Sequence, residues 1–137
     1  MEELGGVLRA LSDPTRARLL NIMSREALCV GDLQKVLALP QPFISRHLAY
    51  LRKAGLACDC RRGQRVVYSI IRTHPLGLAI QTFLREAARR SLALRADLGR
   101  LADYEGAGRL KSSRFRPRMV EENSESQNPS VQLQRAG

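Results

Sequence analysis

The 137-residue sequence contains no tryptophan, and only 4% of its residues are aromatic, so its core must consist mainly of leucine, isoleucine, valine and alanine. It has no apolar run long enough to cross a bilayer and no signal-peptide pattern at its N-terminus. Its three cysteines are too few, and odd in number, for the framework of a secreted disulfide protein. We therefore expect a cytoplasmic protein without a membrane partner.

The sequence also lacks the motifs of common enzyme classes. It has no glycine-rich phosphate loop, and neither of its two histidines lies near a serine or cysteine in a nucleophile-elbow or redox setting. Acidic residues are scarce as well: 13 stand against 23 basic ones, which gives a net charge of +10. We predict that the protein is not an enzyme and that its partner is a polyanion, with nucleic acid favoured.

The basic excess lies mostly in the part of the chain that has hydrophobic periodicity. Residues 1–105 carry a net charge of +7, and residues 106–137 carry +3. From residue 106 onward the periodicity stops, and Gly, Ser, Asn, Gln and charged residues dominate. We therefore predict one folded domain over residues 1–105 and a largely disordered basic and polar tail over residues 106–137.

The most informative stretch runs from Leu33 to Leu56. A short apolar-periodic segment stops at a turn with two prolines, and a second helical segment follows and ends at Gly55. Its apolar residues recur at helical spacing and predict a buried stripe: Ile44, Leu48 and Leu51. The opposite side has hydrogen-bonding and cationic groups and no carboxylate: Gln41, Ser45, Arg46, Ala49, Arg52 and Lys53. This pattern indicates a helix-turn-helix whose second helix enters the DNA major groove, although an ordinary solvated helix has similar periodicity.

The residues after this helix favour the DNA-binding interpretation. Two β-prone runs flank a basic segment at residues 61–65, where Gly63 provides the permissive backbone that a hairpin tip needs. A basic hairpin directly after a recognition helix is a wing, and its arginines can contact phosphates or a narrow minor groove. The alternative is a hairpin whose charges only keep its edge soluble. The two elements together predict a mostly α winged helix-turn-helix with a small β-hairpin.

Further helices are expected on both sides of this unit. Residues 2–11 look helical, with Leu4, Val7, Leu8 and Leu11 on one side, and residues 14–23 look helical too, with Asp13 and Pro14 suited to the helix start and Arg16 and Arg18 expected to be exposed. Residues 27–30 could form a short strand that extends the wing sheet, and Cys29 and Asp32 have the spacing of a capping box at the start of the next helix.

A single long helix is predicted from His74–Pro75 to about Tyr104, with a coiled-coil-like seam. Its residues are Ile80, Leu84, Ala87, Ser91, Leu94, Leu98 and Leu101. We expect this seam to form a homodimer contact, because a two-fold dimer presents two recognition helices to successive grooves; packing on the protein's own core is the alternative.

Four short motifs, in their order along the chain, resemble the ArsR/SmtB family of bacterial winged-helix repressors. They are SDPTR at 12–16, CVGDL at 29–33, QPFISRHL at 41–48 and LRKAGL at 51–56. The resemblance covers residues 4–104. It implies a homodimer, formed through the first and last helices, that represses an operon and leaves its operator DNA when a metal or another inducer binds.

The resemblance also implies which residues read DNA. The family's DNA-reading positions fall on Gln41, Phe43, Ser45, Arg46 and His47, and its wing falls on residues that include Arg61, Arg62 and Arg65. Among these, Arg46 is the best base-reading candidate, because a guanidinium can bind guanine O6 and N7 together. Gln41 could pair with adenine, and Ser45 suits base or phosphate. His47 lies on the flank of the helix, so DNA contact and packing are both open for it.

The cysteines are the candidate inducer ligands. The arsenic-sensing branch resembles Cys-Val-Cys-Asp-Leu where this chain keeps Cys29 but has Gly31 in place of the second thiol. Cys58 and Cys60, two residues apart on a predicted strand, face the same side and form a pair of soft ligands. Trivalent arsenic or antimony, as arsenite or antimonite, is the expected inducer, and copper(I) or zinc also fits thiolates. The zinc-sensing branch uses Asp and His on the last helix, and this chain lacks that pair at the family spacing, which argues against zinc sensing of that type.

Three alternatives to an operator-binding sensor of metals remain open, two for the cysteines and one for the basic winged helix. The cysteines could sense oxidants or persulfides, or they could be ordinary buried small residues with no sensing role. Alternatively, the basic winged helix could bind an acidic protein instead of an operator. That last alternative predicts no DNA affinity with a steep salt dependence, whereas a repressor requires one.

Overall fold

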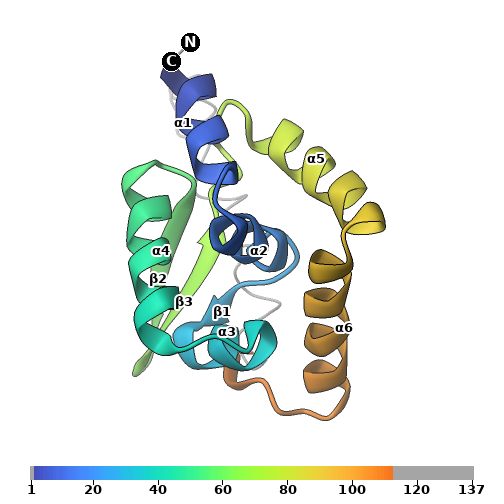
Figure 1. Cartoon of the computed structure of the whole chain (residues 1–137). Helices are drawn as coiled ribbons and strands as arrows, with labels where there is room; N and C mark the ends of the chain where they lie inside the picture. Colours follow the sequence, from blue (N-terminus) through green and yellow to red (C-terminus); the bar gives the residue numbers. More distant parts are fainter. Residues whose placement is uncertain (1, 113–137) are drawn as a thin grey trace, which may run out of the picture.

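The computed structural model describes residues 2–112, which form six helices and a three-stranded antiparallel sheet (Figure 1). The helices are α1 (Glu2–Leu11), α2 (Pro14–Met23), α3 (Val30–Leu37), α4 (Gln41–Lys53), α5 (Gly77–Arg90) and α6 (Leu92–Gly106). The strands are β1 (Leu28–Cys29), β2 (Ala57–Arg62) and β3 (Arg65–Ile70). This confirms the predicted mostly helical fold with a β-hairpin wing. Within the described range, no helix has the length and apolar character that membrane crossing requires.

The sheet joins two distant parts of the chain. Its strand order is β1-β3-β2, and both pairings are antiparallel. β1 pairs Leu28 with Tyr68 and Cys29 with Val67, which confirms that the short run before α3 extends the wing sheet. The middle of β3 is thereby attached to the short strand that leads into α3.

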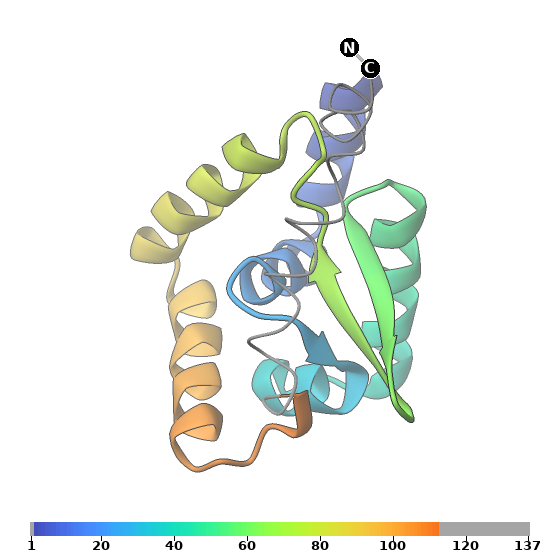
Figure 2. The same ribbon diagram turned by 180° about the vertical axis from the view of Figure 1, so that it is seen from behind.

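The core is centred on α2. Leu19, Leu20 and Ile22 are 0% exposed. In both views α2 lies between two groups of elements, with α4 and the hairpin on one side and α5 and α6 on the other (Figures 1 and 2). The helix begins as predicted, because Asp13 caps it by accepting a 3.1 Å hydrogen bond from the amide of Arg16, and Pro14 follows at a position that needs no N–H.

The prediction of one long helix after the wing is wrong. Two helices form instead, and they meet in a bend at Ser91 (Figure 2). Ser91 has an extended backbone (φ −95°, ψ 120°), and its hydroxyl accepts from the amide of Leu94. A serine side chain competes for backbone hydrogen bonds and favours a helix cap over a helix interior. Helical periodicity does not reveal this break, because the apolar spacing continues through it.

The seam of these two helices packs against the protein's own core, which was the alternative to a dimer contact. Ile80, Leu84 and Leu101 are at most 5% exposed and belong to the same apolar cluster as α2. A side chain buried in one subunit is not available to a second copy. Any dimer contact of α5 must therefore use its other face, which exposes Leu78 and Phe83.

The buried face of α1 differs in part from the face that its apolar spacing predicts. Val7 and Ala10 are buried, whereas Leu4 is 41% and Leu8 58% exposed. The stripe of Leu4, Val7, Leu8 and Leu11 is therefore only partly correct, because burial follows the i, i+3 pair that faces α2. The exposed leucines leave an apolar face on α1.

The segment after α6 is packed, although residues from 106 onward were expected to be disordered. Leu110 and Ser112 are each 3% exposed. The buried carboxylate of Asp32, in the first turn of α3, accepts hydrogen bonds from the amides of Lys111 (3.0 Å) and Ser112 (2.7 Å) and from the Ser112 hydroxyl. The remainder of the predicted tail, residues 113–137, lies outside the described residues, so the domain boundary stays a prediction.

Candidate nucleic-acid interface

The turn between α3 and α4 depends on a backbone reversal at one residue. Ala38 has a φ of 54° and a ψ of 43°, in the left-handed region. The amides of Ala38 and Leu39 both donate to the carbonyl of Gln34, and Pro40 then caps α4. An alanine in this conformation costs about 1–2 kcal/mol. Contacts from elsewhere in the fold must therefore hold the turn in its observed shape.

The end of α4 sets the place of the wing. Gly55 has a φ of 76°, its amide donates to the carbonyl of Arg52, and the amide of Leu56 donates to the carbonyl of Leu51 (2.9 Å). These two bonds form a Schellman motif, and the two leucines that flank it are buried. Because β2 begins at Ala57, directly after the motif, the hairpin has a fixed position beside α4 (Figure 1).

α4 has one buried face and one exposed face, as predicted. Ile44, Leu48 and Leu51 are at most 1% exposed. The exposed residues include no carboxylate: Gln41, Pro42, Phe43, Ser45, Arg46, Ala49, Tyr50, Arg52 and Lys53. Both views place α4 at the edge of the molecule that lies away from α5 and α6 (Figures 1 and 2). The helix thus presents a cationic, hydrogen-bonding surface of the kind that fits a major groove.

Two of the predicted DNA-reading residues contact each other on this face. The guanidinium carbon of Arg46 lies 5.1 Å from the centroid of the Phe43 ring, and Phe43 is 47% exposed. Stacking on an aromatic face stabilises a guanidinium and restricts its rotamers while its N–H groups stay accessible. Arg46 is therefore partly preorganised for a bidentate contact with a base or a phosphate.

The hairpin tip carries arginines on both of its faces. Arg62 pairs with Arg65 across a two-residue turn, and Gly63 has a φ of 61° at the first turn position, which is the geometry of a type II′ turn. Arg61, next to this pair, points to the other face because side chains alternate along a strand. Arg61 and Arg65 are exposed, and Arg62 is half-buried.

One ion pair joins the wing to α4. Arg52 Nε lies 3.1 Å from Asp59 Oδ1, and both side chains are partly exposed. An exposed pair of this kind contributes little stability. It does occupy Arg52, which the sequence had placed on the outward face of α4 with the DNA-reading residues.

His47 occupies a packed position. It is 9% exposed, and its Nδ1 lies 3.9 Å from Asp13 Oδ1, at the start of α2. Burial alone would raise the pKa of Asp13, but the hydrogen bond from the Arg16 amide and the nearby His47 and Arg16 lower it. Of the two roles left open for His47, the structure favours packing over DNA contact.

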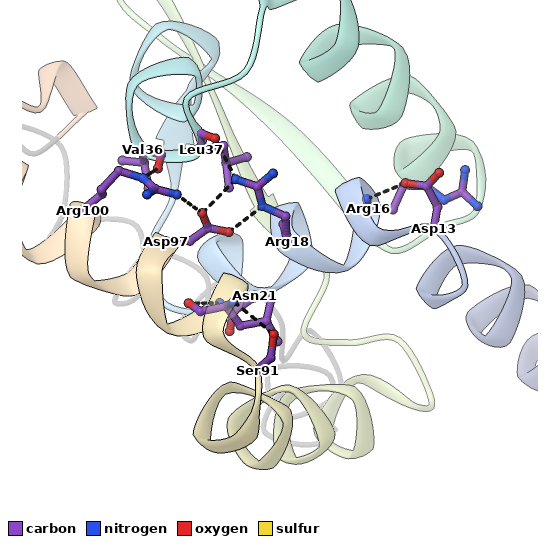
Figure 3. Close-up of polar contacts among 10 residues, drawn as sticks. Asp13, Arg16, Arg18, Asn21, Val36, Leu37, Ser91, Asp97 and Arg100 are labelled. Atoms are coloured by element: carbon purple, nitrogen blue, oxygen red, sulfur yellow. Dashed lines mark hydrogen bonds and ion pairs between the residues drawn. The ribbon is translucent and has the colours of Figure 1, made fainter.

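Both arginines of α2 are bound within the protein. Arg16 donates to the carbonyls of Ala10 (3.1 Å) and Arg9 (2.8 Å), and its guanidinium carbon lies 3.9 Å from the centroid of the Tyr50 ring. Arg18 binds the carboxylate of Asp97 on α6 through two hydrogen bonds of 2.8 and 2.9 Å. The expectation that both side chains are exposed is wrong, because Arg16 meets acceptors on α1 and Arg18 meets an acceptor on α6. Figure 3 shows the contact of Arg18.

The three cysteines lie on one sheet but not in one cluster. Cys29 on β1 and Cys60 on β2 both pair with Val67 on the central strand, so they lie two strand spacings apart, which is about 10 Å between Cα atoms. Cys58 is exposed, and its Sγ is 3.3 Å from the hydroxyl of Ser69. Among residues 2–112, no three or more His, Cys, Asp or Glu side chains are grouped closely enough to hold a metal ion.

Sequence reasoning missed the residues that attach α3 to the end of the chain. Asp32 had been considered only as part of a capping pattern with Cys29, yet it holds residues 111 and 112. Asp97 had no assigned role, yet it is 0% exposed and binds two arginines. One signal was available, since Asp97 is the only acidic residue between Glu86 and Asp103, in a stretch that contains four arginines.

Comparison with known proteins agrees with this geometry. Residues 13–58 match the profile of a family described as "Bacterial regulatory protein, arsR family". The chain is 51% identical over 70 residues to the arsenic resistance transcriptional regulator ArsR1 of Pseudomonas putida, which covers 50% of this chain and 52% of that protein. It is 34% identical over 67 residues to the transcriptional repressor SdpR of Bacillus subtilis, which covers 49% of this chain and 74% of that protein. The chain thus spans only about half the length of the first of these relatives.

Solved structures show the same fold. HlyU from Vibrio cholerae superposes with a TM-score of 0.55 at 28% sequence identity, over 64% of this chain and 89% of that one. NolR from Sinorhizobium fredii gives a TM-score of 0.54 at 27% identity, over 64% of this chain and 83% of that one.

Proposed function

The chain belongs to the arsR family of bacterial regulatory proteins, which are DNA-binding transcriptional regulators and not enzymes, and on this premise we propose that it is a repressor that binds its operator as a homodimer. One observation carries the proposal: the exposed face of α4 has no carboxylate and lies beside a basic hairpin tip. Arg46, Gln41 and Ser45 would read base edges, and the wing arginines would contact phosphates.

The exposed apolar side chains support a dimer. Leu4 and Leu8 on α1 and Leu78 and Phe83 on α5 are 41–78% exposed, and both views place these helices at the same end of the molecule (Figures 1 and 2). A second copy packed on this surface by a two-fold axis would bury it. It would also place two α4 helices on one side, about 34 Å apart for successive major grooves.

The inducer that we propose is trivalent arsenic or antimony bound by thiolates. Cys58 and Cys60 share one face of β2, and soft thiolates suit these elements. The Pseudomonas putida relative is an arsenic resistance transcriptional regulator, which agrees with this choice. Cys29 would join as the third ligand only if β1 or β2 moved, because Val67 separates it from Cys60.

That required movement supplies a route from inducer to DNA release. β1 leads directly into α3, and β2 leads into the wing, so pulling Cys29 toward Cys60 would shift both elements. A ligand shifts an equilibrium only by its preference for one state. Here the three-thiolate complex would favour the state in which the sheet is distorted and the operator is not bound.

The test is fluorescence anisotropy of labelled DNA from upstream of the protein's own gene, with reduced protein and an arsenite titration. We expect tight, salt-dependent binding that arsenite reverses. Cys58→Ser and Cys60→Ser should abolish the arsenite response and leave DNA binding intact, and Ser69→Ala is the control for a change beside Cys58. DNA binding that arsenite does not affect would contradict the inducer, and absence of specific binding would contradict the repressor.

A second candidate inducer is an oxidant or a persulfide, because Cys58 is an exposed thiol next to Cys60. This candidate predicts that peroxide or a persulfide donor releases DNA in the same assay and that a dithiol reductant restores binding. Release by arsenite alone would exclude it. A winged-helix module that binds an acidic protein instead of an operator would show no sequence preference in the same measurement.

A further inference from the structure

The C-terminus of α3 is capped by arginines from other helices. The last carbonyls of a helix have no intrahelical partner, and the reversal at Ala38 directs the following amides to Gln34. The carbonyl of Val36 instead accepts from Arg100 Nε (2.6 Å), and the carbonyl of Leu37 accepts from Arg18 Nη2 (2.7 Å). These cations also lie at the negative end of the α3 dipole, where positive charge is favoured.

One buried carboxylate holds both arginines in place. Asp97 on α6 is 0% exposed. It accepts from Arg18 Nε (2.8 Å) and Nη2 (2.9 Å) and from Arg100 Nη2 (Figure 3). The hydrogen bonds to Asp97 raise the pKa of Arg18. Because a buried carboxylate is costly to leave unpaired, the arrangement is strongly favoured once α6 is in place.

The group lies directly before the recognition helix. Leu37 is followed by the three turn residues 38–40, and α4 begins at Gln41. Ala38 has the strained left-handed backbone, and the carbonyls on its N-terminal side are the ones that Arg18 and Arg100 bind. Fixing these carbonyls therefore fixes the origin of the turn and, through it, the direction in which α4 leaves α3.

We propose that Arg18, Asp97 and Arg100 form a latch, the α3 latch, through which α6 positions α4 for sequence reading. The α3 latch rests on the proposed DNA-binding function, but its three residues touch no base. They are positioning residues that act through the turn. α6 thereby contributes to sequence preference from the opposite side of α2, by hydrogen bonds that cross 64 to 79 residues of sequence.

The test compares Arg100→Ala with Arg95→Ala. Both arginines are on α6, but Arg95 is exposed, whereas Arg100 binds Val36 and Asp97. For folded protein, verified by circular dichroism, we expect Arg100→Ala to lower the affinity for operator about tenfold. Affinity for unrelated DNA of equal length should stay within about twofold, since the lost charge belongs to α6 and not to the exposed face of α4, and Arg95→Ala should change neither. A smaller folded fraction would lower both affinities equally, so the ratio of the two reports positioning.

A second readout does not depend on DNA. Hydrogen exchange of the Ala38 and Leu39 amides should be faster in Arg100→Ala than in Arg95→Ala, while the amides of β2 and β3 stay protected. Arg100→Lys, which keeps a charge that can reach Asp97, should restore part of the protection. Equal exchange at 38–39 and an equal affinity ratio in the two alanine variants would overturn the α3 latch. If the wild-type protein had no operator preference, only the proposed function would fail, and the exchange experiment would still decide whether the latch orders the turn.

Discussion

Arginine has opposite roles on the two sides of this molecule. On the side of α4 and the wing, Arg46, Arg61 and Arg65 are exposed and no carboxylate lies on the helix. On the side of α6, Arg18 and Arg100 are bound to a buried carboxylate and to two helix carbonyls. The same type of side chain is thus accessible to a polyanion on one side and bound within the fold on the other. Net charge alone therefore overstates the surface available to DNA.

The largest expected difference concerns stability. Arg18→Ala should lower the free energy of unfolding by about 3 kcal/mol, because it leaves Asp97 buried with one cation fewer. Arg46→Ala should change it by less than about 0.5 kcal/mol, since an exposed arginine has no buried partner to lose. Urea unfolding followed by circular dichroism measures both. Equal losses of unfolding free energy in the two variants would contradict the distinction between arginines bound within the fold and accessible arginines.

The next largest effect concerns DNA binding, where the exposed Arg46 is expected to matter most. Arg46→Ala should weaken operator binding by about 1–3 kcal/mol and relax sequence preference at one position, because a bidentate base contact is lost. Arg46→Lys keeps the charge but not the fork geometry and should lose preference more than affinity. Anisotropy against a set of single-base operator variants provides the measurement. If Arg46→Ala weakened binding to every sequence alike, Arg46 would be a phosphate contact.

A pH dependence separates the buried carboxylate of Asp32 from an exposed one. Burial alone would raise the pKa of Asp32, but hydrogen bonds from Ser112, Lys111 and Cys29 lower it. A lowered folded-state pKa means that the carboxylate stabilises the fold above its unfolded pKa of about 3.9, and that this contribution is lost as the pH falls through the folded value. Asp32→Asn should cost about 1–3 kcal/mol near neutral pH.

The gap between wild type and Asp32→Asn should close as the pH is lowered below about 4. Unfolding curves at several pH values follow it, and Asp103→Asn, an exposed carboxylate on α6, provides the control with little effect at any pH. A gap that stayed constant down to acidic pH would mean that the ionised form of Asp32 is not what holds residues 111 and 112.

The smallest expected effect comes from removing one arginine of the wing. Arg65→Ala should reduce the slope of log affinity against log salt by about 0.9, the value for one released counterion, with little change in sequence preference. Arg85→Ala on α5, an exposed arginine away from α4, should leave the slope unchanged. An unchanged slope in Arg65→Ala would mean that the wing tip does not contact phosphate.

Local patterns were sufficient to predict the helix-turn-helix and the hairpin. The apolar stripe of α4, the stop at Gly55 and the β-prone runs around Gly63 are all signals within a few residues, and each appears in the structure. The cap at Asp13 is of the same kind. The residues predicted to read DNA are mostly exposed, and His47 is the exception because it lies against α2.

What the sequence could not provide are pairings between distant segments. The partners Arg18 and Asp97 are separated by 79 positions, and no local period links them. The break at Ser91 was hidden for a different reason, since the apolar spacing continues through it and only the serine cap ends the helix. The distance between Cys29 and Cys60 likewise depends on strand order, which places β3 between them.

The attachments of α3 also determine an order of assembly. Its first turn is held by residues 111 and 112, and its last carbonyls are held in part by Arg100. The loops that these contacts close are long, so their entropy must be overcome before the contacts contribute. A ribosome completes α3 and α4 well before it reaches α6. The helices that would meet DNA are therefore made early and fixed in place only when the later part of the chain has folded onto them.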